Sequence, residues 1–285
     1  MKKAIYFNII IALFSLTTAC AQEKEVITTG PEKGSLVIVG GGRVVDTIVK
    51  RFIHLAGGID APIVVIPTAG GDRNFNDNYY FAKLLRDYGA KKVTLLHTYD
   101  KKVANSDAFI KPLKEAKAVW FGGGRQWHLV DIYAGTKSEK MFWEILNKGG
   151  VIGGSSAGAT IQGSYLARGD TKNNQIMMGD HEEGFGFIKN IAIDQHVTAR
   201  NRQFDMFDIL KNKPKLLGIG IDERTAIVVQ GNTFDVIGDG KALIYDGTFW
   251  SREGTNLKTI PPVTSRFYHL QRGDKYDLKE RKVIE

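Results

Sequence analysis

Short apolar runs alternate along the chain with longer stretches whose apolar positions recur every three or four residues. The apolar runs predict β-strands in the first half of the chain, at residues 35–39, 63–66, 92–96, 119–121 and 151–152. Helical periodicity occupies the stretches between them, at residues 44–56, 79–88, 107–116 and 136–147. Such alternation is typical of βαβ units, which build a parallel sheet with helices on both faces. We therefore predict an α/β fold with three layers, αβα, around a mostly parallel sheet.

The pattern changes in the second half of the chain. Strands are predicted at residues 191–194 and 217–221, and short strands separated by turns then follow, at residues 227–230, 233–237 and 242–245. The short strands predict β-hairpins that complete one edge of the sheet. No repeat or low-complexity linker interrupts the chain, so residues 34–285 are predicted to form a single domain with a short C-terminal extension from about residue 247.

The N-terminus has the layout of a secretory signal peptide. Two lysines precede an apolar segment at residues 4–16, which is short for a membrane span, and small residues follow it. We predict that residues 1–21 are a signal peptide, because residues 19–21 read Ala-Cys-Ala and would release a protein that starts at Gln22. The alternative is a lipid anchor on Cys20. Either route predicts an exported protein, periplasmic or secreted, or anchored in the membrane through that lipid alone.

Composition narrows the chemistry. Cys20 is the only cysteine, which excludes a disulfide framework, a thiol nucleophile and a cysteine zinc site in the body of the protein. Residues 1–21 carry two lysines and no acidic residue, so the formal charge without them is +6 rather than +8. The positive residues are scattered, and the densest run, at residues 275–282, reads as a solvated surface. Nucleic-acid binding is therefore not expected.

Glycine clusters follow several predicted strands, at residues 40–42, 70–71, 122–124 and 153–154. In open α/β sheets, ligands bind at the carboxyl ends of the strands, so these loops predict one common crevice. The first cluster lacks the third glycine of the dinucleotide-binding fingerprint, and a nicotinamide cofactor is not expected.

The segment from Gly154 to Gly158 matches the nucleophile-elbow pattern G-x-S-x-G, with Ser156 at its centre. A sharp strand-to-helix turn crowds the serine, and glycines two positions away on either side relieve this crowding. The amide of Ala157 and the start of the following helix would face an oxyanion that forms at Ser156. The alternative interpretation is a glycine-rich turn without chemistry.

A serine nucleophile needs a base, and three histidines are candidates. His97 and His128 lie near strand ends, and position alone does not exclude them. His196 follows the strand at residues 191–194 and opens a polar segment at residues 198–202, a combination that usually lines a site.

Two carboxylates follow the next strand, Asp222 and Glu223. Either could orient the imidazole of His196. The resulting chain order is serine, histidine, acid, whereas α/β-hydrolases have serine, acid, histidine, so the triad would stand on a different scaffold.

Three blocks, at residues 154–158, 194–202 and 218–223, resemble the signatures of the cyanophycinases. These are serine peptidases related to dipeptidase E, and their fold is like that of class I glutamine amidotransferases, which is flavodoxin-like. The resemblance extends from about residue 34 to residue 245. It implies hydrolysis of aspartyl or β-aspartyl peptide bonds through an acyl-enzyme, with β-aspartyl-arginine as the product in true cyanophycinases.

By position, the resemblance also implies residue roles. Ser156 corresponds to the nucleophile, His196 to the general base and Glu223 to the acid that orients it. The residues that correspond to the lining of the substrate site are Gln126, Asp194, Gln195, Arg200 and Arg202. The oxyanion donors are expected to be the backbone amides of Ala157, Gly123 and Gly124. Neither a metal nor an organic cofactor is required by this chemistry.

Three positions depart from the family pattern. Asp205 stands where the family has a third arginine, and Trp127 and His128 replace apolar residues. A reversed charge in a substrate pocket can reverse the preference for a charged side chain, so cyanophycin becomes one candidate among several aspartate-containing peptides or polymers. Two other functions stay open: an esterase or amidase, and an inactive binding protein of the same fold. The sequence leaves the oligomeric state open, a homodimer included.

Overall fold

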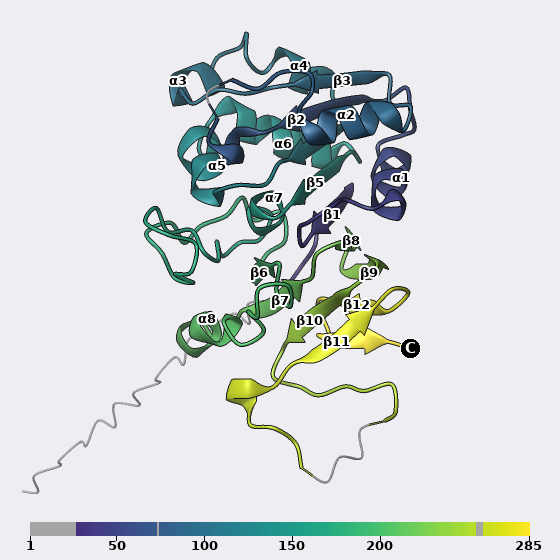
Figure 1. Ribbon diagram of the computed structural model, residues 1–285, viewed down its shortest axis with the longest axis vertical. Coiled ribbons are helices and arrows are strands. Elements are labelled where there is room, and N and C mark those ends of the chain that lie inside the picture. Colours follow the sequence, from purple (N-terminus) through teal and green to yellow (C-terminus); the bar gives the residue numbers. More distant parts are fainter. Residues whose placement is uncertain (1–26, 73, 255–258) are drawn as a thin grey trace, which may run out of the picture.

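The computed structural model describes residues 27–72, 74–254 and 259–285 (Figure 1). The predicted signal peptide and Cys20 lie outside these residues. The helices are α1 (Asp46–Leu55), α2 (Tyr80–Asp87), α3 (Lys101–Ala104), α4 (Lys111–Glu115), α5 (Gln126–Tyr133), α6 (Lys137–Asn147), α7 (Ala157–Thr160) and α8 (Met206–Asn212). The strands are β1 (Ser35–Val39), β2 (Pro62–Ile66), β3 (Lys92–Leu95), β4 (Ala118–Phe121), β5 (Val151–Ser155), β6 (Ile191–Gln195), β7 (Leu217–Ile221), β8 (Thr225–Gln230), β9 (Thr233–Gly238), β10 (Lys241–Tyr245), β11 (Tyr268–Gln271), β12 (Lys275–Asp277) and β13 (Lys282–Ile284).

Within the described residues, nine strands form a large sheet in the order β13-β12-β9-β8-β1-β5-β4-β2-β3. The five strands from β1 to β3 in this order pair in parallel, and the four others are antiparallel to their neighbours. This arrangement confirms the predicted α/β fold around a mostly parallel sheet.

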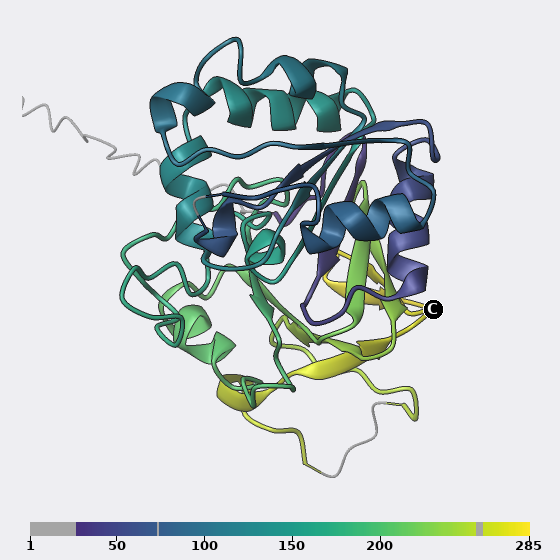
Figure 2. The same ribbon diagram turned by 45° about the horizontal axis from the view of Figure 1, so that its top comes forward.

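Helices cover both faces of the parallel strands (Figures 1 and 2). On one face, Val37 of β1 belongs to the same apolar cluster as residues of α1 and α2, in which Phe81 stacks on Trp120 at 3.6 Å between ring centroids. On the other face, Ile38 belongs to a cluster with Phe142 of α6 and with residues of α4, α5 and α7. Burial of each large apolar side chain contributes about 1.5–3 kcal/mol to the free energy of folding. The two clusters therefore stabilise the packing of the helices on both faces of the sheet.

The strands after residue 190 differ from the single sheet edge that the sequence predicted. β8 and β9 do extend the large sheet, but β10 pairs with β7 in a second sheet of order β11-β10-β7-β6. β7 and β10 are buried almost throughout. An apolar strand that is covered on both faces shows no alternation to indicate its partners, and therefore its place was not visible in the sequence.

The helix predictions at 44–56, 79–88 and 136–147 are confirmed with shifted ends, whereas the predicted helix at 107–116 is limited to α4. Helices α3, α5 and α8 were not predicted. Helix α5 buries Gln126, Leu129, Ile132 and Tyr133 on one face, but the apolar Trp127 and Val130 lie outside that face, so its sequence shows no clear amphipathic stripe. The strands beyond residue 247 are part of the fold, because β12 and β13 form one edge of the large sheet.

Candidate active site

Ser156 lies at the sharp turn between β5 and α7. Its backbone has φ 58° and ψ −113°, a conformation that costs a non-glycine residue about 1–3 kcal/mol, and its amide donates to the carbonyl oxygen of Val39 at 3.0 Å. A Cβ on Gly154 would lie 2.2 Å from the Gly158 oxygen, and one on Gly158 would lie 2.1 Å from the Phe121 oxygen. The two glycines of the pattern therefore allow α7 to pack directly on β4 and β5.

His196 stands immediately after β6, also with a positive φ of 55°. Its amide donates to the Gly40 oxygen at 2.9 Å, so the end of β1 holds the backbones of both Ser156 and His196. The Nε2 atom of His196 lies 2.9 Å from the Ser156 Oγ, and its Nδ1 lies 2.6 Å from Glu223 Oε1. The structure thus brings the three side chains into one hydrogen-bonded chain, in the arrangement of a serine-hydrolase triad.

The surroundings of His196 favour its neutral form. Burial lowers the pKa of the imidazole below its ordinary value, although the hydrogen bond to Glu223 acts in the opposite direction. The positive charges of Arg200 and Arg202 lower the pKa further. A neutral imidazole with its proton on Nδ1, donated to Glu223, leaves Nε2 free to accept the proton of Ser156.

The glycine turn at residues 40–42 packs against this triad. A Cβ on Gly41 would lie 2.2 Å from Cε1 of His196, and a Cβ on Gly42 would lie 2.8 Å from Oε2 of Glu223. The turn that the sequence analysis placed at a ligand crevice therefore makes room for the imidazole and the carboxylate.

The alternative candidates have other partners. Asp222 accepts from the amide and the hydroxyl of Thr198, at 2.8 and 2.5 Å, and is 8% exposed. The Nδ1 atom of His97 lies 2.9 Å from the Thr68 hydroxyl, and that of His128 lies 3.3 Å from the carbonyl oxygen of Ala69. The sequence did not decide which of the two carboxylates orients the imidazole. In the structure, Glu223 is the one that forms a hydrogen bond with His196.

The glycine turn at residues 122–124 borders the serine. A Cβ on Gly123 would lie 3.3 Å from the Ser156 Cβ and 3.9 Å from its Oγ, whereas Gly124 turns toward Ala69, whose oxygen would be 1.9 Å from an added Cβ. In the part of the chain that the structure describes, neither the Gly123 amide nor the Ala157 amide donates to a protein acceptor. Both amides therefore remain free to bind an oxyanion.

Two of the residues that the resemblance assigned to the substrate site have internal partners. The Gln126 side-chain amide donates to the carbonyl oxygens of Ala167 and Arg168, at 2.7 and 2.9 Å. Both oxygens of Asp194 accept from the Arg168 guanidinium, at 2.7 and 2.9 Å. The contacts of Gln126 and Asp194 thus hold the segment around residue 168, and their place in the lining of the substrate site stays a prediction.

Arg200 and Arg202, two further residues of that set, act on His196 through their charges. Arg202 is 2% exposed, and its Nη1 donates at 3.4 Å to the backbone and side-chain oxygens of Gln195. Among the described residues, the Nε and Nη2 atoms of Arg202 have no hydrogen-bond partner. Arg200 is exposed and acts on His196 through its charge. A buried guanidinium with unused donors is suited to an anionic group that enters from outside.

Arg168 is a residue of this region that no sequence pattern indicated. This side chain is 0% exposed and forms ion pairs with Asp194 and also with Asp205, at 2.6 Å. Asp205 therefore does not face the site as an isolated negative charge. Arg168 lies in a segment without regular structure, between α7 and β6, where neither periodicity nor a motif distinguishes one arginine from another.

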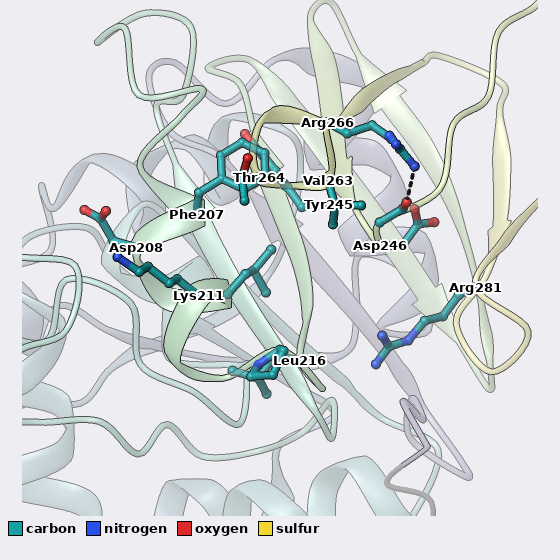
Figure 3. Close-up of a pocket in the computed structure, with 13 residues that line it drawn as sticks. Phe207, Asp208, Lys211, Leu216, Tyr245, Asp246, Val263, Thr264, Arg266 and Arg281 are labelled. Atoms are coloured by element: carbon teal, nitrogen blue, oxygen red, sulfur yellow. Dashed lines mark hydrogen bonds between the residues drawn. The ribbon is translucent and has the colours of Figure 1, made fainter. Parts of the chain in front are cut away.

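A cavity of about 570 Å³ lies between α8, β10 and residues 263–266 (Figure 3). Phe207, Tyr245 and Val263 are among its lining residues, and none of the three triad residues lines it. The Tyr245 hydroxyl donates to the Gln203 oxygen at 2.9 Å. The cavity is therefore separate from the triad.

The described ranges contain neither a candidate metal site nor a candidate membrane-spanning helix. No group of three or more histidine, cysteine, aspartate or glutamate side chains there could hold a metal ion. No helix in these ranges has the length and apolar character needed to cross a bilayer.

Comparison with known proteins gives consistent matches. The family model of peptidase family S51 matches residues 36–237. A cyanophycinase from Geminocystis herdmanii is 30% identical over 260 residues, which cover 87% of this chain and 94% of that protein. One from Trichormus variabilis is 27% identical over 280 residues, which cover 93% of this chain and 92% of that protein. A crystal structure of a peptidase from an acI-B1 actinobacterium is similar with a TM-score of 0.62 and 25% identity, covering 89% of this chain and 98% of that one.

Proposed function

Because this chain belongs to peptidase family S51 and is a serine-type peptidase of the cyanophycinase or dipeptidase E type, we propose that it is an exported enzyme that hydrolyses aspartyl or β-aspartyl peptide bonds. The observation that carries the proposal is the hydrogen-bonded chain from the Ser156 Oγ through His196 to Glu223, with distances of 2.9 and 2.6 Å. The proposed nucleophile is Ser156, the base is His196, and Glu223 orients the imidazole.

The reaction has two steps. As the Ser156 Oγ attacks the substrate carbonyl, His196 Nε2 takes the hydroxyl proton and then gives it to the departing amine, which leaves an acyl-enzyme. Water attacks the acyl group with His196 again as the base, and the second product leaves with a new carboxyl group. The amides of Gly123 and Ala157 are the proposed oxyanion donors, each contributing about 3–4 kcal/mol to the stability of the transition state.

Arg202 supports an aspartate-containing substrate. Its guanidinium is buried, its charge acts on His196, and two of its three nitrogen atoms have no partner in the described residues. A substrate carboxylate next to the scissile bond would satisfy these donors with charge-assisted hydrogen bonds. The relatives at 27–30% identity are named cyanophycinases, and cyanophycin is one candidate substrate of this chain.

The substrate is tested with a panel of β-aspartyl peptides, α-aspartyl peptides and simple esters. We expect hydrolysis of an aspartyl class, loss of that hydrolysis in Ser156→Ala, and near-normal hydrolysis in the neighbouring control Ser155→Ala. Ser155 is the last residue of β5 and lies one position before the turn that presents Ser156, so it is expected to be dispensable. Cleavage of esters alone would contradict the proposed substrate, and activity lost in Ser155→Ala but kept in Ser156→Ala would contradict the proposed nucleophile.

Export is proposed from the N-terminal sequence, which lies outside the described residues. Intact-mass measurement of native material should show a chain that begins at Gln22. A diacylglyceryl group on Cys20 would establish the anchored form, also an exported one, and a chain that retains Met1 would contradict export.

A further inference from the structure

We propose that Arg168 is a positioning residue that keeps Arg202 free for the substrate, by occupying the two carboxylates that would otherwise pair with Arg202. The inference deepens the proposed function and rests on it, since it assigns the substrate carboxylate to Arg202. It names a residue outside the triad on which the preference for acidic substrates depends.

The contacts of Arg168 use nearly all its donors. Nε donates to Asp194 Oδ1 at 2.7 Å, and Nη2 donates to Asp194 Oδ2 at 2.9 Å and to Asp205 Oδ2 at 2.6 Å. Nη1 donates to the carbonyl oxygen of Asn174 at 3.0 Å. One fully buried guanidinium therefore joins β6, the segment before α8 and the loop around residue 174.

Both oxygens of the Asp194 carboxylate accept hydrogen bonds from Arg168. Its Oδ1 also accepts from the amide of Gln195 at 2.9 Å, and the residue is 1% exposed. A buried carboxylate without a partner is strongly unfavourable, so Asp194 would pair with another cation if Arg168 were removed.

Arg202 is the second buried arginine of this region. Its Nη1 donates to the carbonyl oxygen of Gln195, whose own amide donates to Asp194, and the Asp205 amide donates to the carbonyl oxygen of Arg202 at 3.0 Å. Yet neither carboxylate forms an ion pair with Arg202, whose Nε and Nη2 stay unpartnered in the described residues. The free donors of Arg202 thus depend on the fact that Arg168 holds both neighbouring acids.

The consequence is a preference between two matched substrates. A peptide with a free carboxylate beside the scissile carbonyl would bind Arg202, whereas its carboxamide analogue would leave the buried guanidinium poorly satisfied. Hydrogen bonds to charged groups imply a ratio of about 10- to 100-fold in kcat/KM in favour of the carboxylate. If the Arg202 guanidinium were already paired with Asp194, the enzyme would lose this preference.

The experiment measures kcat and KM on the two peptides for the unmodified enzyme, Arg168→Lys and Arg168→Gln. We expect both variants to lose the preference by about tenfold or more, through KM of the carboxylate peptide, with kcat on the carboxamide peptide changed by no more than about twofold. Arg51→Lys is the matched control. Arg51, on the distant α1, also contacts a carboxylate, that of Asp235, and the Arg51→Lys variant should keep the full preference.

A double variant separates positioning from simple loss of structure. Arg168→Gln combined with Asp194→Asn removes both buried charges together, which is better tolerated than removing one. Asp205 is 35% exposed at its side chain and can stay hydrated. Since Asp194 then no longer competes for Arg202, and the released Asp205 is partly exposed to water, the double variant should recover most of the preference. This variant also provides the test if Arg168→Gln alone does not fold.

The outcomes are distinguishable. Preference that is unchanged in both single variants, or absent from a folded double variant, would overturn the role of Arg168. If the unmodified enzyme cleaves neither peptide, the proposed function fails instead, and if it cleaves both equally, Arg202 does not bind the substrate carboxylate.

Discussion

Four residues around the site have a backbone conformation that is rare outside glycine. Ser156, His196 and Arg168 have φ values of 58°, 55° and 58°, and Arg224, which follows Glu223, has 60°. Each backbone amide donates to a carbonyl oxygen of another segment. The pairs are Ser156 with Val39, His196 with Gly40, Arg168 with Met177, and Arg224 with Gly41. The surrounding structure therefore imposes these conformations, and strain of this kind is concentrated where side chains must be aimed.

The first prediction concerns the pH dependence set by His196. Because burial lowers the pKa of His196 and the reaction needs its neutral form, kcat/KM should rise with pH and reach its plateau through a midpoint below the reference value of about 6.5. Arg200→Gln removes a positive charge that lowers this pKa, so the midpoint should move upward. A pH profile of kcat/KM measures both effects.

Arg51→Gln, a change of the same charge on the distant α1, serves as the control and should leave the midpoint in place. A midpoint above 6.5 in the unmodified enzyme, or a downward shift in Arg200→Gln, would contradict the assignment of His196 as the base. His196→Ala should also lower kcat by several powers of ten, whereas His128→Ala should mainly change KM.

At the scale of elements, the turn after β1 organises the site. The carbonyl oxygens at residues 39 and 40 hold the backbones of Ser156 and His196, and the glycines at 41 and 42 leave room for the side chains of His196 and Glu223. Three elements that are far apart in sequence, β5, β6 and β7, thus end at one turn. Their carboxyl ends meet there, as expected for ligand sites in open α/β sheets.

The second prediction tests this turn. Gly41→Ala should lower kcat by more than about 100-fold, because the new Cβ would lie 2.2 Å from the His196 ring and displace it from Ser156. Gly58→Ala is the control, since Gly58 also has a positive φ, 97° against 129° at Gly41, but nothing lies within 4 Å of the added Cβ. Both variants should lose similar stability from the backbone strain, measured by thermal unfolding, and the loss of kcat should be confined to Gly41→Ala. Equal kcat values in the two variants would contradict the proposed contact.

At the scale of the whole molecule, the C-terminal strands complete both sheets. β12 and β13 lie on one edge of the large sheet, and β11 lies on one edge of the smaller sheet (Figure 1). Tyr276 and Leu278 are 0% exposed and belong to the apolar cluster that also contains Ala157 at the nucleophile turn and Ile221 before Asp222. We therefore expect β11, β12 and β13 to unfold together with the other strands and helices.

The third prediction follows from this packing. Leu278→Ala should lower the free energy of unfolding by about 2–5 kcal/mol, because it leaves a cavity in the core, while kcat of the folded enzyme stays nearly constant. Ile284→Ala, at a side chain that is 39% exposed, should change the free energy of unfolding by no more than about 0.5 kcal/mol. Denaturant unfolding measured by fluorescence and by activity gives both values. A separate transition for the C-terminal strands would show that they are not part of the cooperative unit.

The sequence by itself determined the features that depend on neighbouring residues. The alternation of apolar runs and helical periods predicted the parallel sheet and its layers, because burial on one or two faces acts on each element separately. The spacing of Gly154, Ser156 and Gly158 predicted the sharp turn for the same reason, since the crowding is local. The order of the blocks around His196 and Glu223 placed these residues after strands, where a site is expected.

Only the tertiary structure decided the features that depend on distant segments. It placed Glu223 rather than its neighbour Asp222 on the imidazole, because the strand end and the turn at residues 40–42 set the direction of each side chain. It paired β10 with β7, since strands buried on both faces carry no sign of their partners. It also joined Arg168 to two aspartates, 26 and 37 positions further along the chain. Such contacts depend on which segments the fold brings together, and no local pattern encodes that.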